Sequence, residues 1–586
     1  MLGKTNQIIK KLVYAGIVTS VLLAGAAGKA MSAPDSNSIV VDDIEFYVET
    51  DKSFYYLGEN VQMLYRLTKL GFPSVTIPCN RSPELNLVVR KDGETIWMKY
   101  TIWYWYSPGL ELLPGVPCDI TADWDMNDVN GVPVGPGTYD VLGVIYSGFV
   151  IPDVGVRITI LPIPRIITVG LGAGYDFNTI QEAIDDAYDG DTIIVSDGTY
   201  TGDGNRDIDF LGKAITLRSE NGPENCIIDC NGTLAEKHRG FYFHSQEDSN
   251  SVLAGFTVTN GYGLLWYPFP VPAGGAIFCK NSSPRIANCI IKNSTGGFGG
   301  GILCHSSSPV ISDCTVSSNS AVEGGGMYNY ENSCVELINC TFSGNSAEDG
   351  GGVNCNYSVT RLNNCTFSGN RADRGNTLAC DTSFSYPSTV LIANCILRDG
   401  SSGIWNNDSS SIIITYSDIR GGWSGPGGNN IDADPCFADQ GYWDDPCNTP
   451  GDFWDDVWID GDYHLKSQAS RWDANSESWV QDAVTSPCID AGNPGCPLAD
   501  EPAPNGNRRN MGAYGGTAEA SKSPINWRSI ADLTNDWVVD SNDLKVFVGY
   551  WLQMGECIPG DLNRDQSANS ADFALLAMHW LRDENQ

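Results

Sequence analysis

Short stretches of alternating apolar and polar residues run through positions 40 to 163, as in LNLVVRKDGETIWMKYTIWYW. A period of two is the pattern of a strand that buries one face. Lys91-Asp92-Gly93-Glu94 lies between two apolar runs and predicts a hairpin turn, because Asp-Gly tolerates the positive φ angles of a tight turn. Since no convincing helical period occurs in this region, we predict an all-β sandwich over residues 40–163.

Further along the chain, a phrase of cysteine, asparagine and glycine recurs at an almost constant step. It reads CIIKNSTGGFGGGILCH from Cys289, and variants of it begin at Cys314, Cys340 and Cys365. The phrases begin 25, 26 and 25 residues apart. A repeat of that length is too short for most two-helix repeats, but it fits one coil of a parallel β-helix with three short strands and three turns. Because such coils stack about 4.8 Å apart, like residues would lie above like residues.

Stacking of this kind predicts columns of identical side chains. Cysteine is small and apolar, so a column of thiols can fill a narrow core; a metal or redox site is the alternative, but CxxC pairs are missing. The glycine triplets would supply positive φ angles and close approach between coils. The predicted columns are Cys289, Cys314, Cys340 and Cys365; Cys304, Asn329, Cys355 and Cys380; and a turn ladder of Asn319, Asn345 and Asn370.

A different pattern precedes the repeat. In FNTIQEAIDDAYDGDTIIVSDGTYTG the apolar residues Ile180, Ala183, Ile184 and Ala187 fall on one face of a short helix, and Thr192–Val195 begins a strand. An amphipathic helix here would cover the open end of a β-helix core. Helix and repeat together predict a solenoid over residues 164–520.

Several motifs resemble those of known families. The helix and strand just described resemble the N-terminal cap of pectin lyase-like right-handed β-helices. GGAIFC at 274 and the CTFSGN phrases resemble the repeats of polymorphic outer-membrane proteins, which are surface β-helices implicated in adhesion. SPCIDAGNP and NGNRRNMGAYGG resemble the C-terminal coils of large secreted bacterial β-helix proteins.

The N-terminal region has its own resemblance. Tyr56-Leu57-Gly58-Glu59, KDGETIW and GPGTYDVLG resemble the bacterial intracellular proteinase inhibitor domain (BsuPI) over most of the predicted sandwich. The resemblance implies an immunoglobulin-like sandwich. It does not establish protease inhibition, because a multidomain chain can use such a sandwich as a spacer or a binding module.

Near the C-terminus, oxygen-bearing side chains recur at positions 1, 3, 5, 9 and 12 of two loops, which begin at Asp532 and Asp561. That spacing wraps a loop round a hard cation such as Ca2+, with the backbone carbonyl of position 7 as a further ligand. The last Asp of each loop begins an apolar helix. The predicted ligands are Asp532, Thr534, Asp536, Val538, Asp540 and Asp543 in the first loop, and Asp561, Asn563, Asp565, Ser567, Asn569 and Asp572 in the second.

The duplicated loop and helix at 528–584 look like a type I dockerin, a small α-helical, EF-hand-like calcium module. The resemblance implies a cohesin domain of a scaffold or surface protein as the partner, and such modules often accompany polysaccharide-degrading enzymes. Trp537 and Gln566 replace the glycine usual at position 6, and Thr534 stands at position 3. These departures predict weaker calcium binding, above all in the first loop. The alternative is an acidic helical hairpin without calcium.

Charge and the N-terminus bear on location. The chain has 35 Lys and Arg against 71 Asp and Glu, a net charge of -36, which argues against nucleic-acid binding. Its five histidines lack metal-site spacing.

Lysines followed by an apolar run and small residues predict a signal peptide over 1–33, with a retained anchor as the alternative. Since no later run could span a bilayer, we expect an extracellular or cell-surface protein.

Export also favours disulfides among the 19 cysteines. Cysteines outside the columns lie in loop-like contexts, and spacing alone cannot fix their connectivity. The candidate bridges are Cys79/Cys118, Cys226/Cys230, Cys436/Cys447 and Cys488/Cys496.

Two regions could act on a glycan. Arg371, Arg374 and Asp381, with Asp373 beside them, hold the densest charge in the regular coils, and Arg361 lies one coil earlier. They could serve a polysaccharide lyase or glycoside hydrolase, or they form a solvated turn. A second group could form a sugar-stacking platform, although we favour a loop packed over the end of the solenoid. That group is Trp443, Trp454, Trp458 and Trp472, near His464.

The sequence therefore predicts a mainly β protein with an immunoglobulin-like sandwich, a right-handed parallel β-helix and a dockerin-like module. The regular coils favour a noncatalytic surface protein, adhesive or carbohydrate-associated and tethered through the module. A polysaccharide lyase or glycoside hydrolase of the pectin lyase-like fold is the alternative. The negative charge predicts neutral glycans as ligands, or calcium-dependent binding of acidic ones.

Overall fold

The computed structural model describes residues 35–78, 84–99, 109–146, 154–266, 271–381, 386–400, 403–446 and 456–580. Contacts divide the chain into two units, Met1–Ile163 and Pro164–Gln586. The signal peptide predicted over 1–33 lies outside the described residues. Within them, every helix is too short or too polar to cross a membrane.

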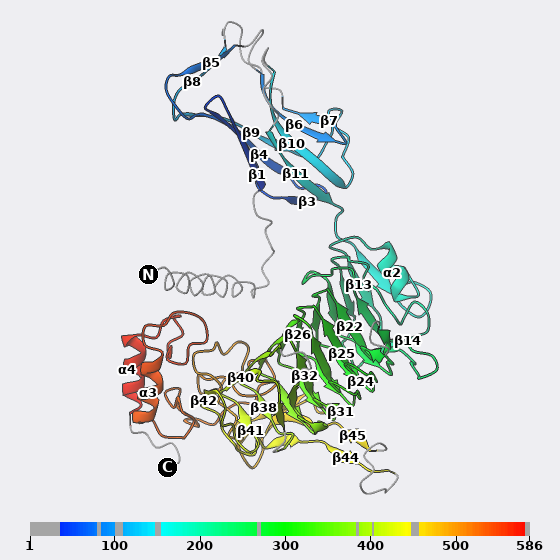
Figure 1. Ribbon diagram of the computed structural model, residues 1–586, viewed down its shortest axis with the longest axis vertical. Coiled ribbons are helices and arrows are strands. Elements are labelled where there is room, and N and C mark those ends of the chain that lie inside the picture. Colours follow the sequence, from blue (N-terminus) through cyan, green and yellow to red (C-terminus); the bar gives the residue numbers. More distant parts are fainter. Residues whose placement is uncertain are drawn as a thin grey trace. The chain divides into compact units, whose positions relative to one another are not determined.

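The first unit contains two β-sheets that enclose one hydrophobic core (Figure 1). The predicted hairpin turn is confirmed, since Lys91 pairs with Glu94 and the two residues between them have positive φ angles. The sheets are β1 (Asp35–Val41), β2 (Ile44–Thr50), β4 (Val61–Lys69) and β9 (Pro117–Trp124), and β3 (Phe54–Tyr56), β11 (Val154–Leu161), β10 (Gly137–Tyr146), β6 (Glu84–Lys91) and β7 (Glu94–Met98); β5 (Val75–Pro78) pairs with β8 (Gly109–Leu112).

Alternation in the sequence becomes alternation in burial in this unit. Along β2, every second side chain is buried, from Ile44 through Phe46 and Val48 to Thr50. The buried rings of Trp124 and Tyr139 meet edge to face, with centroids 5.7 Å apart. The inward faces of both sheets therefore form a core of β-branched and aromatic side chains.

The second unit begins with a parallel β-helix of three sheets (Figure 1). The 11-stranded sheet holds β12 (Ile166–Val169), β13 (Thr192–Val195), β15 (Thr216–Ser219), β18 (Val252–Ala254), β23 (Arg285–Ala287), β26 (Val310–Ser312), β29 (Cys334–Ile338), β33 (Val359–Asn363), β37 (Thr389–Ala393), β40 (Ser411–Thr415) and β42 (Gly427–Gly428). The nine-stranded sheet holds β14 (Gly198–Thr201), β16 (Cys226–Asp229), β19 (Thr257–Thr259), β24 (Ile290–Lys292), β27 (Thr315–Ser317), β30 (Thr341–Ser343), β34 (Thr366–Ser368), β38 (Ile396–Leu397) and β41 (Asp418–Ile419). The seven-stranded sheet holds β17 (Phe241–Phe243), β22 (Ile277–Lys280), β25 (Ile302–His305), β28 (Met327–Tyr330), β32 (Val353–Asn356), β36 (Leu378–Cys380) and β39 (Ile404–Asn406).

The predicted amphipathic helix lies at the N-terminal end of this solenoid. Helix α2 (Ile180–Asp186) buries Ile180, Ala183 and Ile184 and is capped by Thr179, whose hydroxyl accepts from the backbone N–H of Glu182. Its buried residues belong to the same core as the strands. The helix therefore closes the end of the core that the first strands would otherwise leave open.

The cysteine columns are confirmed. Strand pairing places Cys279, Cys304, Asn329, Cys355 and Cys380 one above the next. Column cysteines are buried free thiols. Asn329, which interrupts the column, donates from its amide to the Thr360 hydroxyl at 2.9 Å, so the polar residue has a partner inside the core.

The asparagine ladder is also confirmed. Each amide oxygen accepts from the backbone N–H one coil earlier, and each amide NH2 donates to a backbone carbonyl such as Val316 O, 2.8 Å from Asn345 Nδ2. The ladder ends on Asp399, which accepts from the Asn370 amide and the Thr377 hydroxyl. Burial raises the pKa of Asp399 to about 6.

Glycine triplets serve two purposes, as predicted. The first glycine of each triplet has a positive φ, for example 70° at Gly324. At the second, a Cβ would come within 2.7 Å of the next coil's backbone, as at Gly325 against Gly351 O. Turn conformation and coil-to-coil approach both exclude a side chain here.

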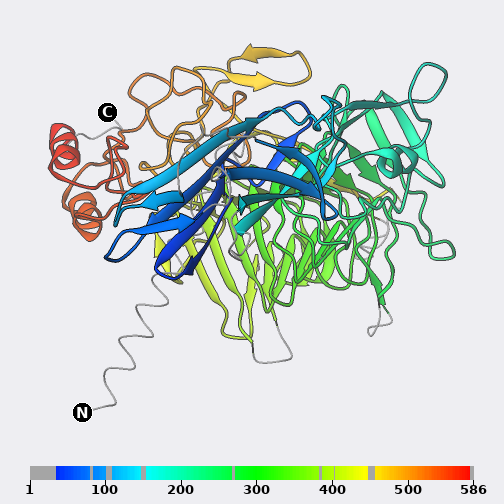
Figure 2. The ribbon, with the colours of Figure 1, turned by 90° about the horizontal axis from the view of Figure 1, so that it is seen from above.

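Beyond the solenoid, the chain forms short hairpins and two helices. The helices α3 (Ser541–Gly549) and α4 (Ser570–Met578) lie side by side in both views (Figure 1, Figure 2).

The second unit also contains two-stranded sheets. Two of them belong to loops of the solenoid: β20 (Leu264–Trp266) with β21 (Val271–Ala273), and β31 (Ser346–Asp349) with β35 (Arg371–Arg374). Those after the solenoid are β43 (Phe437–Asp439) with β46 (Asp462–Leu465), β44 (Tyr442–Asp444) with β45 (Val457–Ile459), and β47 (Arg471–Asp473) with β48 (Ser478–Val480).

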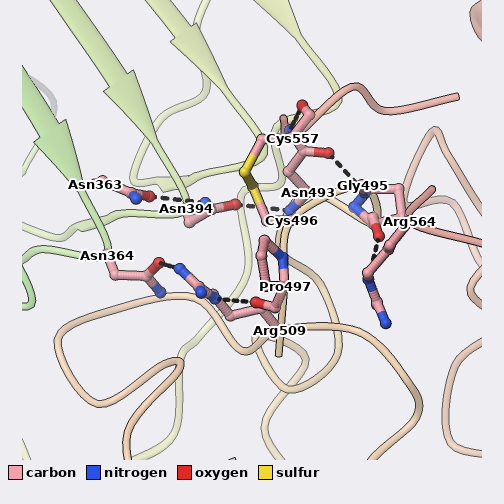
Figure 3. The surroundings of a disulfide bond; sticks show 11 residues. Asn363, Asn364, Asn394, Asn493, Gly495, Cys496, Pro497, Arg509, Cys557 and Arg564 are labelled. Atoms are coloured by element: carbon pink, nitrogen blue, oxygen red, sulfur yellow. Dashed lines mark hydrogen bonds between the residues drawn. A yellow bond between two sulfur atoms is a disulfide. The ribbon is translucent and has the colours of Figure 1, made fainter. Parts of the chain in front are cut away.

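One disulfide occurs among the described residues, and it differs from the predicted bridges. Cys496 bonds to Cys557, far along the chain, and so links the segment after the solenoid to the loop–helix region (Figure 3). The predicted bridges Cys226/Cys230 and Cys488/Cys496 are therefore wrong, since Cys226, Cys230 and Cys488 are buried free thiols. The remaining two predictions involve Cys79 and Cys447, which lie outside the described residues.

Candidate functional site

The two predicted calcium loops, 532–543 and 561–572, share one hydrogen-bond frame. In each, the first Asp accepts from the backbone N–H groups four and five residues on: Asp532 from Asp536 and Trp537, and Asp561 from Asp565 and Gln566. The distances run from 2.7 to 3.1 Å. The same sequence spacing thus folds the same way twice, with the carboxylate of position 1 held inside the loop.

Position 12 of each loop joins the loop to its helix. Asp543 accepts from the N–H groups of Thr534 and Asp540, and Asp572 accepts from those of Asn563 and Asn569. Asp540 and Asn569 are the N-caps of α3 and α4, and each forms a reciprocal capping box with the position-12 Asp. A change at the loop would therefore be transmitted to the first turn of the helix.

The missing position-6 glycines do not change the backbone path. Trp537 has a φ of 73° and Gln566 a φ of 70°, so both adopt the left-handed conformation that glycine favours. A bulky residue in that region is strained, which persists only where the surroundings hold it. The sharp turn that a calcium loop needs is therefore present in both loops.

The two loops differ in how their carboxylates gather. Asp561, Asp565 and Asp572 offer oxygens that all lie within 4.8 Å of one another, and burial raises the pKa of Asp561. Within the described part of the chain, no other three groups of this kind bring their ligand atoms so close together. Hard carboxylate oxygens at that spacing fit Ca2+, with Asn563, Asn569 and the Ser567 carbonyl at the remaining predicted ligand positions.

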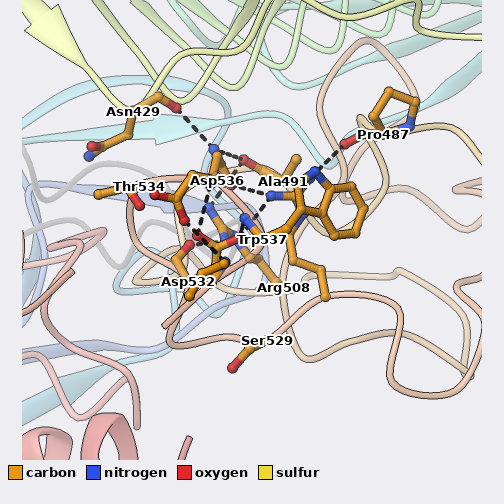
Figure 4. Close-up of polar contacts among 12 residues, drawn as sticks. Asn429, Pro487, Ala491, Arg508, Ser529, Asp532, Thr534, Asp536 and Trp537 are labelled. Atoms are coloured by element: carbon orange, nitrogen blue, oxygen red, sulfur yellow. Dashed lines mark hydrogen bonds and ion pairs between the residues drawn. The ribbon is translucent and has the colours of Figure 1, made fainter. Parts of the chain in front are cut away.

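A cation of the chain lies at the first loop. Arg528 Nη1 lies 2.9 Å from Asp532 Oδ2, and both side chains are fully buried. Figure 4 shows Asp532 beside Trp537, from whose backbone N–H it accepts a hydrogen bond. The Arg528 guanidinium also packs 3.8 Å from the centroid of the Trp537 ring. Thr534 donates its hydroxyl to Asp543 at 3.0 Å. In the first loop, therefore, the negative charge of the predicted ligand Asp532 is neutralised by an arginine of the same chain.

The charged cluster predicted at 371–381 divides in the structure. Arg371 stacks 3.9 Å from the Trp443 ring centroid and pairs with Asp456. Arg374 pairs instead with Asp349 and, at 3.2 Å, with Asp381. Arg361 lies on β33 of another sheet and donates to the Cys334 thiol, so it does not join them.

The structure adds two carboxylates that the sequence analysis missed. Phe298, Glu323, Asp349 and Arg374 form one column, each directly before a glycine of the repeat. Burial raises the pKa values of Glu323 and Asp349. Comparing equivalent positions of successive coils, rather than charge along the chain, could have found them.

An aromatic stack lies beside this column. The rings of Phe298 and Tyr328 stack with centroids 5.2 Å apart, and Tyr330 follows at 5.8 Å. The Tyr328 hydroxyl accepts from the Asn356 amide at 3.2 Å and neighbours Glu323. The tyrosine beside Glu323 is therefore a buried member of an aromatic cluster. We call Glu323, Asp349, Arg374 and Asp381 the carboxylate–arginine cluster.

The tryptophan-rich insertion packs against the side of the solenoid, not over its end. Trp458 is 7% exposed and covers Gly344 and Gly369, whose missing side chains leave room for the indole. Trp443 donates to Gly369 O at 2.7 Å. The prediction that these two residues form a free sugar-stacking platform is therefore wrong. Trp454 lies outside the described residues, and Trp472 packs against Trp479.

His464, predicted near that platform, is also a packed residue. It is 2% exposed, stacks on Tyr514 with ring centroids 3.6 Å apart, and lies between Asp462 and Glu519. Although burial opposes it, these two carboxylates raise the pKa of His464. The residue stabilises the segment after the solenoid and offers no open surface to a ligand.

Comparison with protein families agrees with the solenoid. The family model for a right-handed β-helix region matches residues 184–342 and 275–432, and one described as disaggregatase related matches residues 425–492. The solenoid is thus a right-handed parallel β-helix. Among curated proteins, none matches the chain significantly.

Several solved structures are similar to the chain. A pectin methylesterase from carrot is 13% identical, with a TM-score of 0.27, over 44% of this chain and 82% of that one. Pectate lyase Pel9A is 13% identical, with a TM-score of 0.29, over 60% and 96%. A Yersinia enterocolitica family 28 exopolygalacturonase is 9% identical, with a TM-score of 0.22, over 65% and 86%.

Proposed function

We propose that the chain is an exported, carbohydrate-associated or adhesive β-helix protein, tethered to a cohesin-type scaffold by a calcium-binding dockerin module at its C-terminus. The observation that carries the proposal is the duplicated loop frame. Both loops enclose an Asp at position 1, turn at a left-handed position 6 and cap a helix through position 12. In the second loop, three carboxylates gather as hard-cation ligands do.

The helices that follow the loops also support a docking role. Trp551 and Trp580 occupy equivalent positions in the two repeats, and they are 42% and 39% exposed. Val548, Met554 and Phe573 are exposed on the same small module, at 45% or more. Large apolar side chains repeated on the surface of so small a module favour a partner protein, and the dockerin resemblance suggests a cohesin.

The proposal predicts that binding to cohesins depends on calcium and on the repeated tryptophans. We expect the full chain to bind at least one member of a panel of immobilised type I cohesins in calcium, and to lose at least tenfold in affinity in chelator. Trp551→Ala with Trp580→Ala should also lose at least tenfold, because buried aromatic anchors dominate interfaces. Surface plasmon resonance measures both effects.

A control and a contrary result are available. Tyr386→Ala removes a ring that is 57% exposed on the solenoid and should leave cohesin binding unchanged. Equal binding in calcium and chelator, or no binding to any cohesin, would argue against the tether. The β-helix part is tested separately on immobilised glycans, where the net charge of -36 predicts binding to neutral polymers, or to acidic ones only with calcium.

A second candidate function is glycoside hydrolysis at the carboxylate–arginine cluster. Hydrolysis needs one carboxylic acid that protonates the leaving oxygen and one carboxylate that deprotonates the attacking water. Burial raises the pKa of Glu323 and so favours its protonated form, while Asp349 and Asp381 both pair with Arg374. Glu323 would give its proton to the glycosidic oxygen as the bond to the anomeric carbon breaks, and Asp349 or Asp381 would take the proton of the incoming water.

The arrangement favours a hydrolase over a lyase. A lyase would need an Arg or Lys as the base, and Arg374 is held by two carboxylates at once. The partially exposed Arg374 and Asp381 leave the cluster open to solvent on one side, since their side chains are 44% and 26% accessible. A neutral glycan fits better than a polyuronate, because three carboxylates already lie at the cluster.

Measuring reducing ends released from plant and algal glycans tests this second function. If the cluster is catalytic, Glu323→Gln should lower the rate at least about 100-fold, the usual cost of losing a general acid. Glu348→Gln changes the exposed neighbour of Asp349 and should leave the rate unchanged. Release that survives Glu323→Gln would remove the cluster from consideration, and the absence of any release by the wild type would leave the adhesive function.

A further inference from the structure

A buried arginine occupies the first calcium loop. Arg528 donates to Asp532 Oδ2 at 2.9 Å and to Asn535 Oδ1 at 3.3 Å, and its guanidinium stacks on Trp537. Neither Arg528 nor Asp532 is exposed. A second buried cation, Arg508, donates to the backbone carbonyl of Asp532 at 2.6 Å (Figure 4). Position 1 therefore has one guanidinium on its carboxylate and another on its backbone carbonyl.

The second loop has an arginine at position 4, Arg564, but its guanidinium donates to the backbone carbonyls of Pro494 and Asn507 and not to Asp561. When the two repeats are aligned with Asp532 on Asp561, the residue that corresponds to Arg528 is Cys557, which forms the disulfide with Cys496 (Figure 3). Asp561 makes the same two backbone contacts as Asp532, but no ion pair with it occurs among the described residues. The two loops share one backbone frame and differ in whether a protein cation neutralises position 1.

Electrostatics decides what this difference means for an ion. A divalent cation bound between Asp532 and Asp543 would lie within a few ångströms of the Arg528 guanidinium, and like charges at such distances repel strongly away from water. Separating the guanidinium from Asp532 would leave a buried arginine without its partner, which is strongly unfavourable. Position 3 is weakened as well, since Thr534 offers a neutral hydroxyl oxygen to a cation in place of a carboxylate.

The first loop is also attached to the end of the solenoid. Asn535, at position 4, donates from its amide to Asn429 O at 2.9 Å and to Ala491 O at 3.0 Å. Arg508, which holds Asp532, donates to Gly492 O, and Arg528 donates to Pro487 O. The contacts that fix this loop therefore come from the chain itself and require no ion.

We propose that the Arg528 guanidinium takes the place of the ion in the first loop, so that the module binds a single Ca2+, in the second loop, while the first loop is a calcium-independent joint to the solenoid. This inference rests on the proposed function in one respect, namely that the module binds calcium at all. The geometry of Arg528, Asp532 and Asn535 carries the rest.

Position 5 offers a matched pair of variants for the test. Asp536 and Asp565 are both exposed, and each accepts from the backbone N–H two residues on, at 3.1 Å. Replacing either with asparagine keeps that acceptor and removes one charge. Equilibrium dialysis of the full chain with Ca2+ should give one ion per wild-type chain. Asp565→Asn should weaken that binding at least tenfold, and Asp536→Asn should change it less than twofold.

The outcomes separate the inference from the proposed function. Two ions in the wild type, or one ion that is weakened by Asp536→Asn and not by Asp565→Asn, would overturn the single-site inference and leave a calcium-dependent tether possible. No bound ion would reject the calcium part of the proposed function and the inference with it. These variants change exposed residues, so the test does not depend on disrupting the core.

Arg528→Met tests the role of the arginine itself. Removal of the guanidinium leaves Asp532 and Asp543 without their protein cation, and we expect the bound calcium to rise from one ion to two. The thermal midpoint of this variant should also become more sensitive to chelator than that of the wild type. A folded Arg528→Met that still binds one ion would overturn the role assigned to Arg528. If the variant does not fold, the position-5 pair decides.

Discussion

Asn345→Leu is expected to lower the free energy of unfolding by about 3–5 kcal/mol, the range of the most damaging single substitutions. Asn345 is fully buried, and its side chain makes four hydrogen bonds, two accepted from Asn319 and one donated to each of Val316 O and Asn370. Leucine has the same branching but no polar atoms, so it leaves the N–H of Asn319 and the Val316 carbonyl without the Asn345 side chain as a partner, and each buried unsatisfied group costs about 1–3 kcal/mol.

Urea denaturation followed by circular dichroism would measure the loss. Asn293→Gly provides the control, because Asn293 is an exposed asparagine of the same repeat with a φ of 53°, which glycine adopts without strain, and the change should cost less than about 1 kcal/mol. If Asn345→Leu cost no more than Asn293→Gly, the ladder would be a consequence of stacking and not one of its causes.

The repeat made the solenoid predictable in detail because the physics of stacking is local. Once coils lie about 4.8 Å apart in register, the matching residue of the next repeat becomes a neighbour in space. The columns through Cys304 and Asn345, and the interruption at Asn329, follow from that single fact. The capping helix was predictable for a similar reason, because its apolar face is visible in the local sequence.

Contacts without a period were not predictable from the sequence. The Cys496–Cys557 bond joins two irregular segments, and no spacing rule identifies such a pair. Arg528 precedes the loop it neutralises, so a search of loop positions passes over it. Glu323 and Asp349 were missed although the repeat contains them, because charge was compared along the chain and not down the columns.

The packing of the insertion after the solenoid was also not predictable from the sequence. Its tryptophans are visible in the sequence, but the surface that receives Trp458 is made by two glycines a full coil apart. A Cβ on Gly344 or Gly369 would lie 2.0 or 2.1 Å from the indole of Trp458. Both glycines have positive φ angles and end a CTFSG phrase, so the strand repeat that stacks the coils also forms the groove that binds the insertion.

Trp458→Ala is therefore expected to cost about 3–5 kcal/mol of the free energy of unfolding, as for other large aromatic residues removed from a core. The loss has two parts, because the variant empties the groove over Gly344 and Gly369 and also removes the ring against which Trp443 packs, with centroids 5.4 Å apart. Trp405→Ala is the matched control, since Trp405 is 38% exposed on the solenoid and should cost about 1 kcal/mol or less. Chemical denaturation of both variants, with limited proteolysis to follow release of residues 437–465, measures the difference. Equal stability of the two variants would mean that the insertion rests on the solenoid without stabilising it.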